Sequence, residues 1–447
     1  MQSLDIITRK RDGVSLQQEE LDYLVSGYLS GSVPDYQMSA FLMSVFLQGF
    51  DRQEMADYTW SLVNSGQRLK WKDLPGPVVD KHSSGGVGDK TSLVVVPLLA
   101  AAGLYAPKMS GRGLGFTGGT IDKLESIPGL KTVLSTEQLH AQVVRTGGAI
   151  VSQSPELTPA DGKIYELRDV TATVDSIPLI AASIMSKKIA GGANHIILDV
   201  KAGSGAFMEK KEKAVKLAAS MVELGKRLEC QVKAVVTDMN QPLGHAIGNS
   251  LEIQEVLSAL KGEGPADLRE LALSLAAHLI KDTGRASNYE EAFNYTAKLL
   301  DEGWGYEKFR EIVEAQNGNF NLLENSEISA ASMQEKIKSS QRGYIVSMDA
   351  SKLGRASLYL GAGRLYKGDD IDPEVGIEVH RKVGDFVDRG DCLLTLYAND
   401  RHKLDAGLQE ASQAFKVQEE KVSLPPLIYQ VVDEESAASI YIEAEGK

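Results

Sequence analysis

The first part of the chain, residues 1–66, alternates apolar and polar positions with the period of an α-helix. Apolar side chains recur at roughly helical spacing over residues 36–46, and Gly49 ends the pattern. Residues 15–18 (SLQQ) and 51–54 (DRQE) have the spacing of N-terminal capping boxes. These signals predict a small helical domain.

The middle of the chain has a different pattern, in which short β-rich runs alternate with helical stretches. The runs PVVDK, HIILDVK and KAVVTDMN are separated by segments rich in alanine, leucine and lysine, such as residues 211–228. This alternation predicts a largely parallel, mixed α/β sheet domain over residues 71–330. Parallel sheets bind ligands at the carboxyl ends of their strands, where Lys81, Lys201 and Asp238 are expected to lie.

The last part, residues 341–447, becomes β-rich again after a polar stretch. The segment EVGIEVHRKVGDFVDRGDCLLTL places glycine and aspartate turns between short alternating strands, much as in the hammerhead folds that include biotinyl and lipoyl carriers. A carrier needs a modifiable lysine at a hairpin tip, whereas Lys382 precedes the turn at Gly384 and Asp385. We therefore expect a structural α+β, hammerhead-like subdomain.

Composition is that of an ordinary globular protein and limits the partners. The 447 residues are 43% hydrophobic and 24% charged, with a formal net charge of −13. This charge opposes binding to nucleic acid and to anionic membranes, because the long-range field repels polyanions. Any anion site must therefore be made by a local group of cations.

Cysteine content and hydropathy favour a cytoplasmic location. Cys230 and Cys392 are far apart and lack metal-ligand spacing, so no disulfide framework is expected. The N-terminal segment MQSLDIITRKRDG lacks the apolar stretch of a secretory signal. The longest apolar run, residues 93–102, contains Pro97 and is too short to cross a membrane.

The first cluster with chemical potential is KHSSGGVGDKTS at residues 81–92. It combines lysine, an imidazole, hydroxyls and flexible backbone amides ahead of a helix, which are the components of an oxyanion site. The run GGVGDKTS is similar to a P-loop, but Asp89 stands where a P-loop has glycine, and its carboxylate would repel a triphosphate. A smaller anion is expected, with an ordinary glycine-rich turn as the alternative.

Two further clusters follow. Residues 108–120 (KMSGRGLGFTGGT) have five glycines in nine residues, which lets the backbone approach a ligand closely at an entropic cost. Further on, Ser183 and Lys187 share a helix face, and Arg168 offers a planar fork for a carbonyl or imide edge. Alternatively, acidic neighbours such as Asp161 pair with basic residues on a solvated surface.

Together the clusters resemble a known family. SGRGLGFTGGTIDKLESIPG is similar to the long signature of the pyrimidine-nucleoside and thymidine phosphorylases, and KHSSGGVGDKTS, LRDVTATVDSIPLIAASIMSKK and DVKAGSGAFM fall where other family segments fall. The resemblance covers nearly the whole chain. It implies reversible phosphorolysis of uridine, thymidine and deoxyuridine to free base and α-D-(deoxy)ribose 1-phosphate. It also implies a homodimer whose small helical domain, joined in space by residues 160–190, closes over the α/β domain.

The resemblance implies roles for the residues at matching positions. Phosphate would be bound by Lys81, Ser83, Ser92, Lys108, Ser110 and Thr120. The nucleoside base would be bound by Tyr165, Arg168, Ser183 and Lys187. His82, titrating near neutral pH, would protonate or hydrogen-bond O2 of the leaving pyrimidine, while Arg168 and Lys187 stabilise its negative charge. The alternative for His82 is a purely positional hydrogen bond.

Departures from the family pattern bear on specificity and on a metal. Lys108 stands where thymidine-specific relatives commonly have an apolar residue, which favours use of uridine as well as thymidine; a thymidine-specific enzyme is the alternative. Phe116 replaces the usual histidine of GLGHTGGT. Some members hold a potassium-like cation, and Lys90, which replaces a small residue there, would displace or repel it. The matching metal positions are Gly88, Leu243, Ala246 and Glu255.

Two other classes of function remain. Enzymes similar to anthranilate phosphoribosyltransferase share the helical-plus-α/β plan and a glycine-rich anion loop, but they bind pyrophosphate and magnesium through acidic motifs, and no matching pair of motifs occurs here. A non-catalytic nucleoside or sugar-phosphate sensor would need no imidazole beside the anion loop. No organic cofactor is expected.

Overall fold

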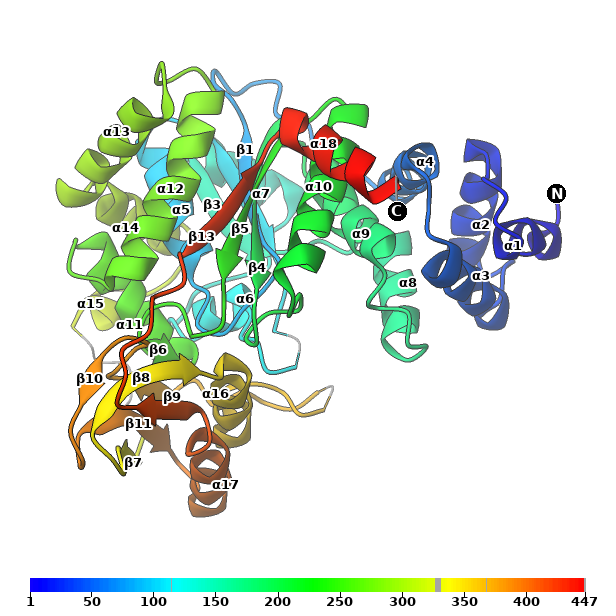
Figure 1. Cartoon of the computed structure of the whole chain (residues 1–447). Helices are drawn as coiled ribbons and strands as arrows, with labels where there is room; N and C mark the ends of the chain where they lie inside the picture. Colours follow the sequence, from blue (N-terminus) through cyan, green and yellow to red (C-terminus); the bar gives the residue numbers. More distant parts are fainter. Residues whose placement is uncertain (114, 326–330, 367, 446–447) are drawn as a thin grey trace.

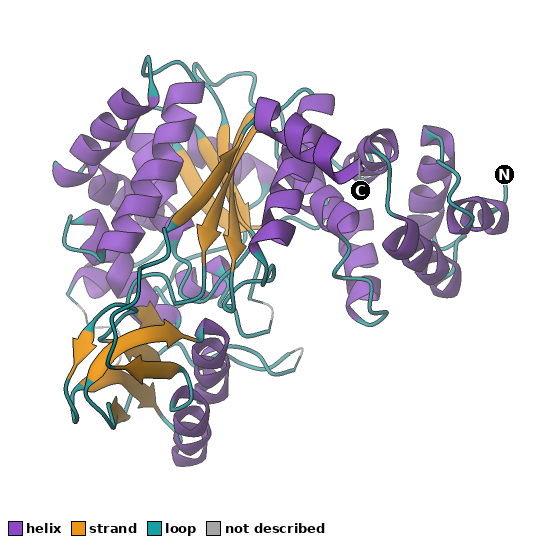
Figure 2. Ribbon diagram, in the orientation of Figure 1, coloured by secondary structure: helices purple, strands orange, loops and turns teal. Residues whose placement is uncertain are grey.

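The computed structural model describes residues 1–113, 115–325, 331–366 and 368–445; Leu114, within the glycine-rich signature, lies outside the described residues. The chain forms a helical N-terminal unit, a large α/β unit and a β-rich C-terminal unit (Figures 1 and 2). This arrangement confirms the predicted fold class.

Four helices build the N-terminal unit: α1 (Ser3–Arg11), α2 (Gln18–Ser30), α3 (Asp35–Gln48) and α4 (Arg52–Val63). The predicted capping box at the start of α4 is present, because Asp51 and Glu54 each accept the other's backbone N–H. The box predicted at residues 15–18 is wrong. The Ser15 hydroxyl donates to Asp51 instead, at 2.6 Å, and α2 begins with the N–H of Gln17 donating to Glu20.

The core of the helical unit includes side chains from later in the chain. Leu42 of α3 is fully buried, whereas Tyr36, at the start of the predicted apolar pattern, is 74% exposed. Helices α8 (Pro159–Asp169) and α9 (Ile177–Ala190) contribute Ile164 and Leu179 to the same hydrophobic cluster. Two helices that line the cavity described below are therefore packed into the core of the helical unit.

A four-stranded sheet in the order β1-β4-β5-β13 forms the centre of the α/β unit (Figure 2). Its first three strands are parallel, as predicted: β1 (Val79–Ser83), β4 (His195–Ala202) and β5 (Gln231–Asp238). A second parallel pair, β2 (Ala106–Ser110) and β3 (Gly148–Ser152), lies beside β1. The carboxyl ends of these strands face the same side of the unit.

Helices cover both faces of the sheet, so the parallel strands are apolar on both sides. Along β4, Ile196 and Leu198 pack with α10 (Lys211–Arg227), whereas Ile197 packs with side chains of α5 (Thr91–Ala101) on the other face. The unit's other helices are α6 (Thr120–Leu124), α7 (Thr136–Thr146), α11 (Asn249–Leu260), α12 (Ala266–Asp282), α13 (Tyr289–Asp301), α14 (Trp304–Ala315) and α15 (Phe320–Glu324). No helix in the described ranges is long and apolar enough to cross a membrane.

The C-terminal unit contains two small sheets, in the orders β10-β8-β12 and β6-β9-β11-β7. Their strands are β6 (Ala246–Ile247), β7 (Met333–Lys338), β8 (Gly343–Met348), β9 (Gly376–Val379), β10 (Phe386–Val387), β11 (Cys392–Ala398) and β12 (Phe415–Gln418). Helices α16 (Ala350–Ser357), η1 (Leu358–Ala362) and α17 (Arg401–Ala411) complete it. Because β6 precedes α11, the α/β unit itself supplies an edge strand to the C-terminal sheet.

The end of the chain departs from the predicted boundary. The sequence predicts one subdomain over residues 341–447, but β13 (Ile428–Val432) pairs antiparallel with β5, and α18 (Glu434–Glu445) packs on α10 (Figure 1). The returning strand satisfies the N–H and C=O groups at the edge of the parallel sheet. A short strand pattern does not reveal which sheet edge it joins, so the sequence could not place it.

Candidate active site

A cavity of about 590 Å³ lies between the α/β unit and helices α8 and α9. This volume is in the range of small-molecule sites. The two glycine-rich segments form one wall, and α8 and α9 form the other. Predicted site residues that line it are His82, Ser83, Ser92, Lys108, Ser110, Thr120, Tyr165, Arg168, Ser183 and Lys187.

The first wall begins where β1 ends. Gly85 and Gly88 have φ values of +92° and +71°, in the left-handed region that favours glycine. The following carboxylate, Asp89, accepts from the N–H and the hydroxyl of Thr91 at the start of α5, at 3.1 and 2.7 Å. Asp89 thus takes a helix-terminal amide that a P-loop would offer to a phosphate. This geometry agrees with the expectation that the turn does not hold a triphosphate.

Lys81 lies beneath this turn rather than in the cavity. Its fully buried ammonium contacts the Thr91 hydroxyl, the Ser92 hydroxyl at 3.3 Å and the Asp199 carboxylate at 3.4 Å. Ser92 also lines the cavity. In this arrangement the charge of Lys81 acts on the cavity through a shell of hydroxyl groups.

Two other strand-end residues, Lys201 and Asp238, lie at the carboxyl ends of β4 and β5 but do not line the cavity. The Lys201 ammonium pairs with Asp199 at 2.8 Å. Asp238 accepts from the hydroxyl of Tyr429 in β13 at 2.5 Å. Both side chains are used inside the fold, so their place at the edge did not make them site residues.

The floor of the cavity holds two lysines that share one aspartate. Lys188 pairs with Asp80 at 2.8 Å, whereas Lys108 lies 3.8 Å from the same carboxylate and donates to the carbonyl of Met109 at 2.9 Å. Burial, and then the neighbouring Lys188 ammonium, lower the pKa of Lys108 well below its usual value. Because two cations share one anion, the floor carries an excess of positive charge.

His82 lies next to this floor. Burial, reinforced by the Lys188 and Lys108 ammonium groups, lowers the pKa of His82 well below its usual value. The imidazole is therefore neutral at neutral pH in the ligand-free protein, which differs from the predicted titration near neutrality. The physical reason is the local excess of cations, and a bound anion would raise the pKa of His82 again.

Lys187 dominates the opposite wall. It donates to the Ser183 hydroxyl at 3.0 Å, which confirms the predicted shared helix face, and it pairs with Asp161 at 2.5 Å. The same ammonium lies 5.7 Å from the ring centre of Tyr165. Asp161 is buried. The acidic pairing that the sequence left as an alternative thus occurs inside the site rather than on a solvated surface.

The guanidinium of Arg168 already makes hydrogen bonds within the protein, which its planar shape alone does not predict. Its guanidinium donates to the carbonyls of Thr173, Val174 and Leu179 at 3.2, 2.8 and 3.2 Å. Those bonds hold the connection between α8 and α9 in place. A guanidinium has five N–H donors, so two remain beyond these three bonds, and Arg168 also lines the cavity.

The glycine-rich segment 108–120 folds back on itself. A Cβ atom added to Gly119 would lie 2.1 Å from the backbone nitrogen of Gly113, so a side chain cannot be accommodated there. Asp122 fixes the loop by accepting from the N–H of Gly113 at 2.6 Å. Phe116 lines the cavity and packs against α16 of the C-terminal unit. This segment therefore contacts both the cavity and the C-terminal unit.

Comparisons with known proteins match nearly the whole chain. A family described as glycosyl transferase, helical bundle domain, matches residues 4–66, its a/b domain matches residues 75–306, and the pyrimidine nucleoside phosphorylase C-terminal domain matches residues 344–418. A pyrimidine-nucleoside phosphorylase from Geobacillus stearothermophilus is 45% identical over 430 residues, covering 96% of this chain and 99% of that protein. One from Staphylococcus aureus is 46% identical over 435 residues, covering 97% and 100%. The chain belongs to the pyrimidine-nucleoside phosphorylase family.

The fold is shared more widely than this phosphorylase family. A solved anthranilate phosphoribosyltransferase from Thermus thermophilus aligns with a TM-score of 0.58 and 17% identity, covering 70% of this chain and 100% of that chain. At this identity the likeness concerns the fold alone. It explains why the helical-plus-α/β plan could not by itself separate the two classes of enzyme.

Several residues that line the cavity carry no clear signal in the sequence. Asp80 and Lys188 were not predicted, although each adjoins a predicted residue, Lys81 or Lys187. Neighbouring positions on a strand or helix point to different sides, so only one residue of each pair was expected to face the ligand. The doublet of lysines in SIMSKK was the available signal. Gln153, Phe207 and Glu209 also line the cavity without having been predicted.

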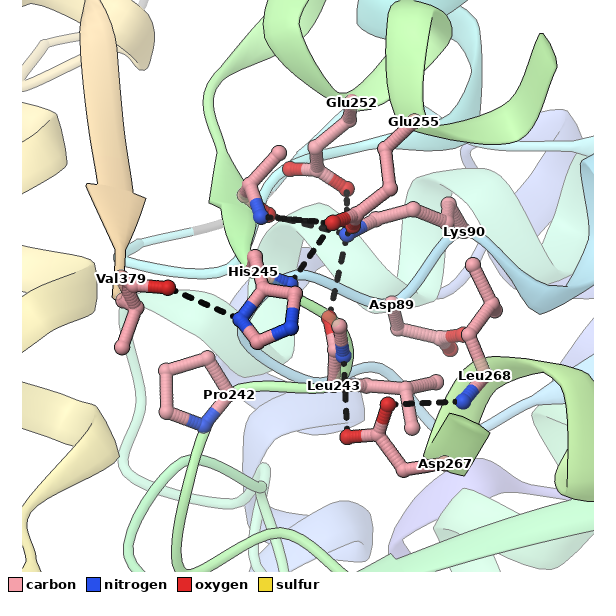
Figure 3. A network of polar contacts seen from close by, with 12 residues as sticks. Asp89, Lys90, Pro242, Leu243, His245, Glu252, Glu255, Asp267, Leu268 and Val379 are labelled. Atoms are coloured by element: carbon pink, nitrogen blue, oxygen red, sulfur yellow. Dashed lines mark hydrogen bonds and ion pairs between the residues drawn. The ribbon is translucent and has the colours of Figure 1, made fainter. Parts of the chain in front are cut away.

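The potassium-like ion of some phosphorylases does not fit the matching positions in this chain. The Lys90 ammonium donates to the carbonyls of Leu243 at 3.0 Å and Ala246 at 2.9 Å and pairs with Glu255 (Figure 3). These are three of the four residues implied as metal ligands; the fourth, Gly88, packs against the same two carbonyls. A second cation at this place would be repelled by the ammonium.

Proposed function

We propose that this protein catalyses the reversible phosphorolysis of pyrimidine nucleosides to free base and α-D-(deoxy)ribose 1-phosphate. The observation that carries the proposal is a cavity with an under-neutralised floor of Lys108 and Lys188 opposite a second cationic wall of Arg168 and Lys187. Buried cations without full partners are costly unless an anion joins them. In phosphorolysis two anions meet at one sugar, which suits two separated groups of cations.

The chemistry needs no group beyond the substrates. A phosphate oxygen forms a bond to C1′ as the bond from C1′ to the pyrimidine nitrogen breaks, and the electron pair of that bond leaves with the base. The proton of hydrogenphosphate ends on the released pyrimidine. Because phosphate attacks from the face opposite the base, no covalent enzyme intermediate is required. The protein contributes orientation and electrostatic stabilisation.

Phosphate binding is assigned to the wall built from the two glycine-rich segments. The side chains concerned are Ser83, Ser92, Lys108, Ser110 and Thr120. Lys81 acts from beneath, through the hydroxyl groups that it contacts. Hydrogen bonds to a charged group contribute roughly 1.5–3 kcal/mol each, so this set can hold a dianion in an acidic protein.

Base binding is assigned to α8 and α9. Ser183, Lys187 and the free donors of Arg168 face the carbonyl and imide edge of the pyrimidine, and Tyr165 packs on its ring. His82 hydrogen-bonds O2 as a neutral imidazole. Once phosphate is bound, its charge raises the pKa of His82, so that the imidazole can take up the proton that hydrogenphosphate gives up and pass it to the leaving base.

We also propose a cytoplasmic homodimer that associates through the helical unit. Leu4 in α1 is 62% exposed, and Tyr36 and Leu47 in α3 are 74% and 72% exposed, a concentration of apolar surface that favours a protein contact. Cys230 and Cys392 are both free thiols, which supports a reducing compartment. Light scattering at micromolar concentration tests the dimer, and a monomeric mass contradicts it.

The decisive experiment incubates the protein with uridine and phosphate and follows base release by ultraviolet absorbance. Release that requires phosphate and yields one ribose 1-phosphate per base supports phosphorolysis. Tight uridine binding without turnover would instead indicate a sensor. Release that requires pyrophosphate and magnesium would indicate a phosphoribosyltransferase.

Breadth of specificity is a separate proposal that rests on Lys108. Its ammonium in the cavity floor favours use of ribosides as well as deoxyribosides, so we expect uridine and thymidine to be used at comparable efficiency. A two-substrate competition measures the ratio of kcat/KM values directly. A strong preference for thymidine would favour the thymidine-specific alternative.

A further inference from the structure

Lys90, the residue before α5, has an ammonium enclosed by oxygen atoms (Figure 3). Its side chain is 0% exposed. The ammonium donates to the carbonyl oxygens of Leu243 at 3.0 Å and Ala246 at 2.9 Å and pairs with the carboxylate of Glu255. A second carboxylate, Glu252, lies 3.9 Å away.

The charges around Lys90 keep it protonated. Burial would lower the pKa of Lys90, but the carboxylates of Glu255 and Glu252 outweigh burial, and the pKa is raised above its usual value. The group is therefore a permanent cation across the physiological range of pH. Without the Lys90 ammonium, the carboxylate of Glu255 would lose the cation with which it is in direct contact.

The atoms around the ammonium form the kind of donor set that a hard cation takes. Two main-chain carbonyls and a carboxylate converge on one point, and oxygen ligands of this type suit ions without directional bonding. A lysine ammonium is itself a compact point charge. We propose that the Lys90 ammonium is a built-in monovalent cation, held in the place that the family resemblance implies for a potassium-like ion, so that this protein needs no such ion.

The loop held by Lys90 is shared with the C-terminal unit. From the other side, Lys382 donates to the carbonyls of Pro242 and Gly244, the latter at 2.8 Å, and pairs with Asp267 at 3.0 Å. Four carbonyls of this loop are thus divided between two ammonium groups: Lys90 takes those of residues 243 and 246, and Lys382 takes those of residues 242 and 244. Lys382, which the carrier hypothesis would need as a free hairpin lysine, is instead committed to this contact.

The same loop is fixed to the C-terminal sheet by a reciprocal pair of contacts. The backbone N–H of Val379 donates to the carbonyl of His245 at 2.8 Å, and the His245 ring nitrogen Nδ1 lies 2.8 Å from the Val379 carbonyl (Figure 3). Immediately afterwards the chain forms β6, the edge strand of that sheet. The cation at Lys90 therefore stabilises the junction between the two units.

Lys90 is also connected to the cavity wall through its neighbours. It directly follows Asp89, whose carbonyl accepts from Lys123 at 2.6 Å, and Lys123 pairs with Glu252 at 2.7 Å. A Cβ atom added to Gly88 would lie 2.8 Å from the Leu243 carbonyl oxygen, so the anion-binding turn rests directly on the loop that Lys90 holds. Removing the cation is expected to loosen this turn as well as the junction.

The test uses two variants of the full chain. Lys90→Ala removes the ammonium and leaves the oxygen cage open, whereas Lys90→Met fills much of the same space without charge. Thermal midpoints are measured by scanning calorimetry in choline chloride and then with potassium chloride replacing choline at constant ionic strength. Choline is too large for the cage, so it serves as the background cation.

We expect three different responses. The wild-type Tm is the same in both salts. The Lys90→Ala variant loses several degrees in choline chloride and regains most of them with potassium, along a saturable curve as for a ligand that binds only the folded state. The Lys90→Met variant stays low in both salts. Phosphorolysis by Lys90→Ala should recover over the same range of potassium concentration.

Two results would overturn the proposal. One is a Lys90→Ala variant that is insensitive to potassium, sodium and ammonium alike. The other is a wild-type protein whose Tm rises with potassium as much as that of the variant. If Lys90→Ala does not accumulate, Lys90→Thr replaces it, and failure of both to fold in potassium chloride also contradicts an open cation site. The calorimetric readout does not depend on catalysis, so it can succeed or fail separately from the proposed function.

Discussion

Lys90 and Lys108 are both buried lysines of the α/β unit, yet their surroundings are opposite. Lys90 has two carbonyls and a carboxylate within contact distance, and its pKa is raised because the nearby carboxylates outweigh burial. Lys108 donates to one carbonyl and lies 3.8 Å from the carboxylate of Asp80, which also pairs with Lys188. Burial, together with the charge of Lys188, lowers the pKa of Lys108. Burial alone therefore does not tell a structural cation from one that awaits a ligand.

The difference lies in how completely each charge is compensated. A cation that is fully surrounded by oxygens has no reason to bind anything further, and its loss leaves the oxygens unpaired. An under-compensated cation makes the ligand-free protein less stable and makes the binding of an anion more favourable. For this reason residues with perturbed pKa values are often found at functional sites. We therefore expect the cavity floor to bind a ligand and the cage of Lys90 to be structural.

The largest expected effect comes from the two groups that are proposed to act on the leaving base, Lys187 in the wall opposite the floor and His82 beside the floor. Replacing Lys187 by methionine, or His82 by alanine, should lower kcat/KM for uridine by about 10²–10³-fold, because each removes a group that acts on the charge of the leaving base. Steady-state phosphorolysis measures this loss. Lys298→Met, at a lysine that is 67% exposed, is the matched control and should keep the wild-type rate. Wild-type rates in both site variants, with unchanged thermal stability, would refute the site.

A second test sets the two buried lysines directly against each other. Lys108→Met should raise KM for phosphate by about 10- to 100-fold, the equivalent of one charged hydrogen bond of roughly 1.5–3 kcal/mol. It should also leave Tm unchanged or higher, since it removes a poorly compensated charge. Lys90→Met should do the reverse and lower Tm. Calorimetry of both variants in one buffer measures the two changes in Tm. Equal destabilisation would contradict the distinction between a structural Lys90 and a ligand-binding Lys108.

Much of the lining of the candidate site was predictable because its residues are clustered along the chain. The turn after β1, the glycine-rich segment 108–120 and the pair Ser183 and Lys187 are local patterns, and the structure brings them to one cavity. The compensation of charge was not predictable. Lys90 donates to Leu243 across 153 positions of sequence, and no local pattern encodes that pairing.

The fold shows the same division. Periodicity was sufficient for the helices of the N-terminal unit and for the parallel strands β1, β4 and β5, since each element carries its own signal. It was not sufficient for β13, which returns to the α/β sheet, nor for the helix start at Gln18, where a tertiary bond from Ser15 to Asp51 overrides the local capping pattern. Long-range pairing decided both.

The smallest expected effect concerns pH and follows from His82, which lies beside the under-compensated floor. Its pKa is lowered in the folded, ligand-free protein, whereas the unfolded chain has a pKa of about 6.5. As pH falls below that value, His82 binds a proton in the unfolded state but not in the folded state. The free energy of unfolding therefore decreases by up to about 1.4 kcal/mol per pH unit.

The variant His82→Asn should remove this component, so that its Tm falls less than that of the wild type between pH 7.5 and pH 5.5. Other buried histidines, such as His278 with a pKa of about 4, contribute equally to both proteins and cancel in the difference. Saturating phosphate should narrow the difference, because the anion offsets the lysine charges and raises the pKa of His82 towards its unfolded value. A parallel loss of stability in both proteins, with and without phosphate, would show that the charge of the floor does not affect the pKa of His82. The electrostatic difference between Lys90 and Lys108 would then have no consequence for the group that is proposed to act on the leaving base.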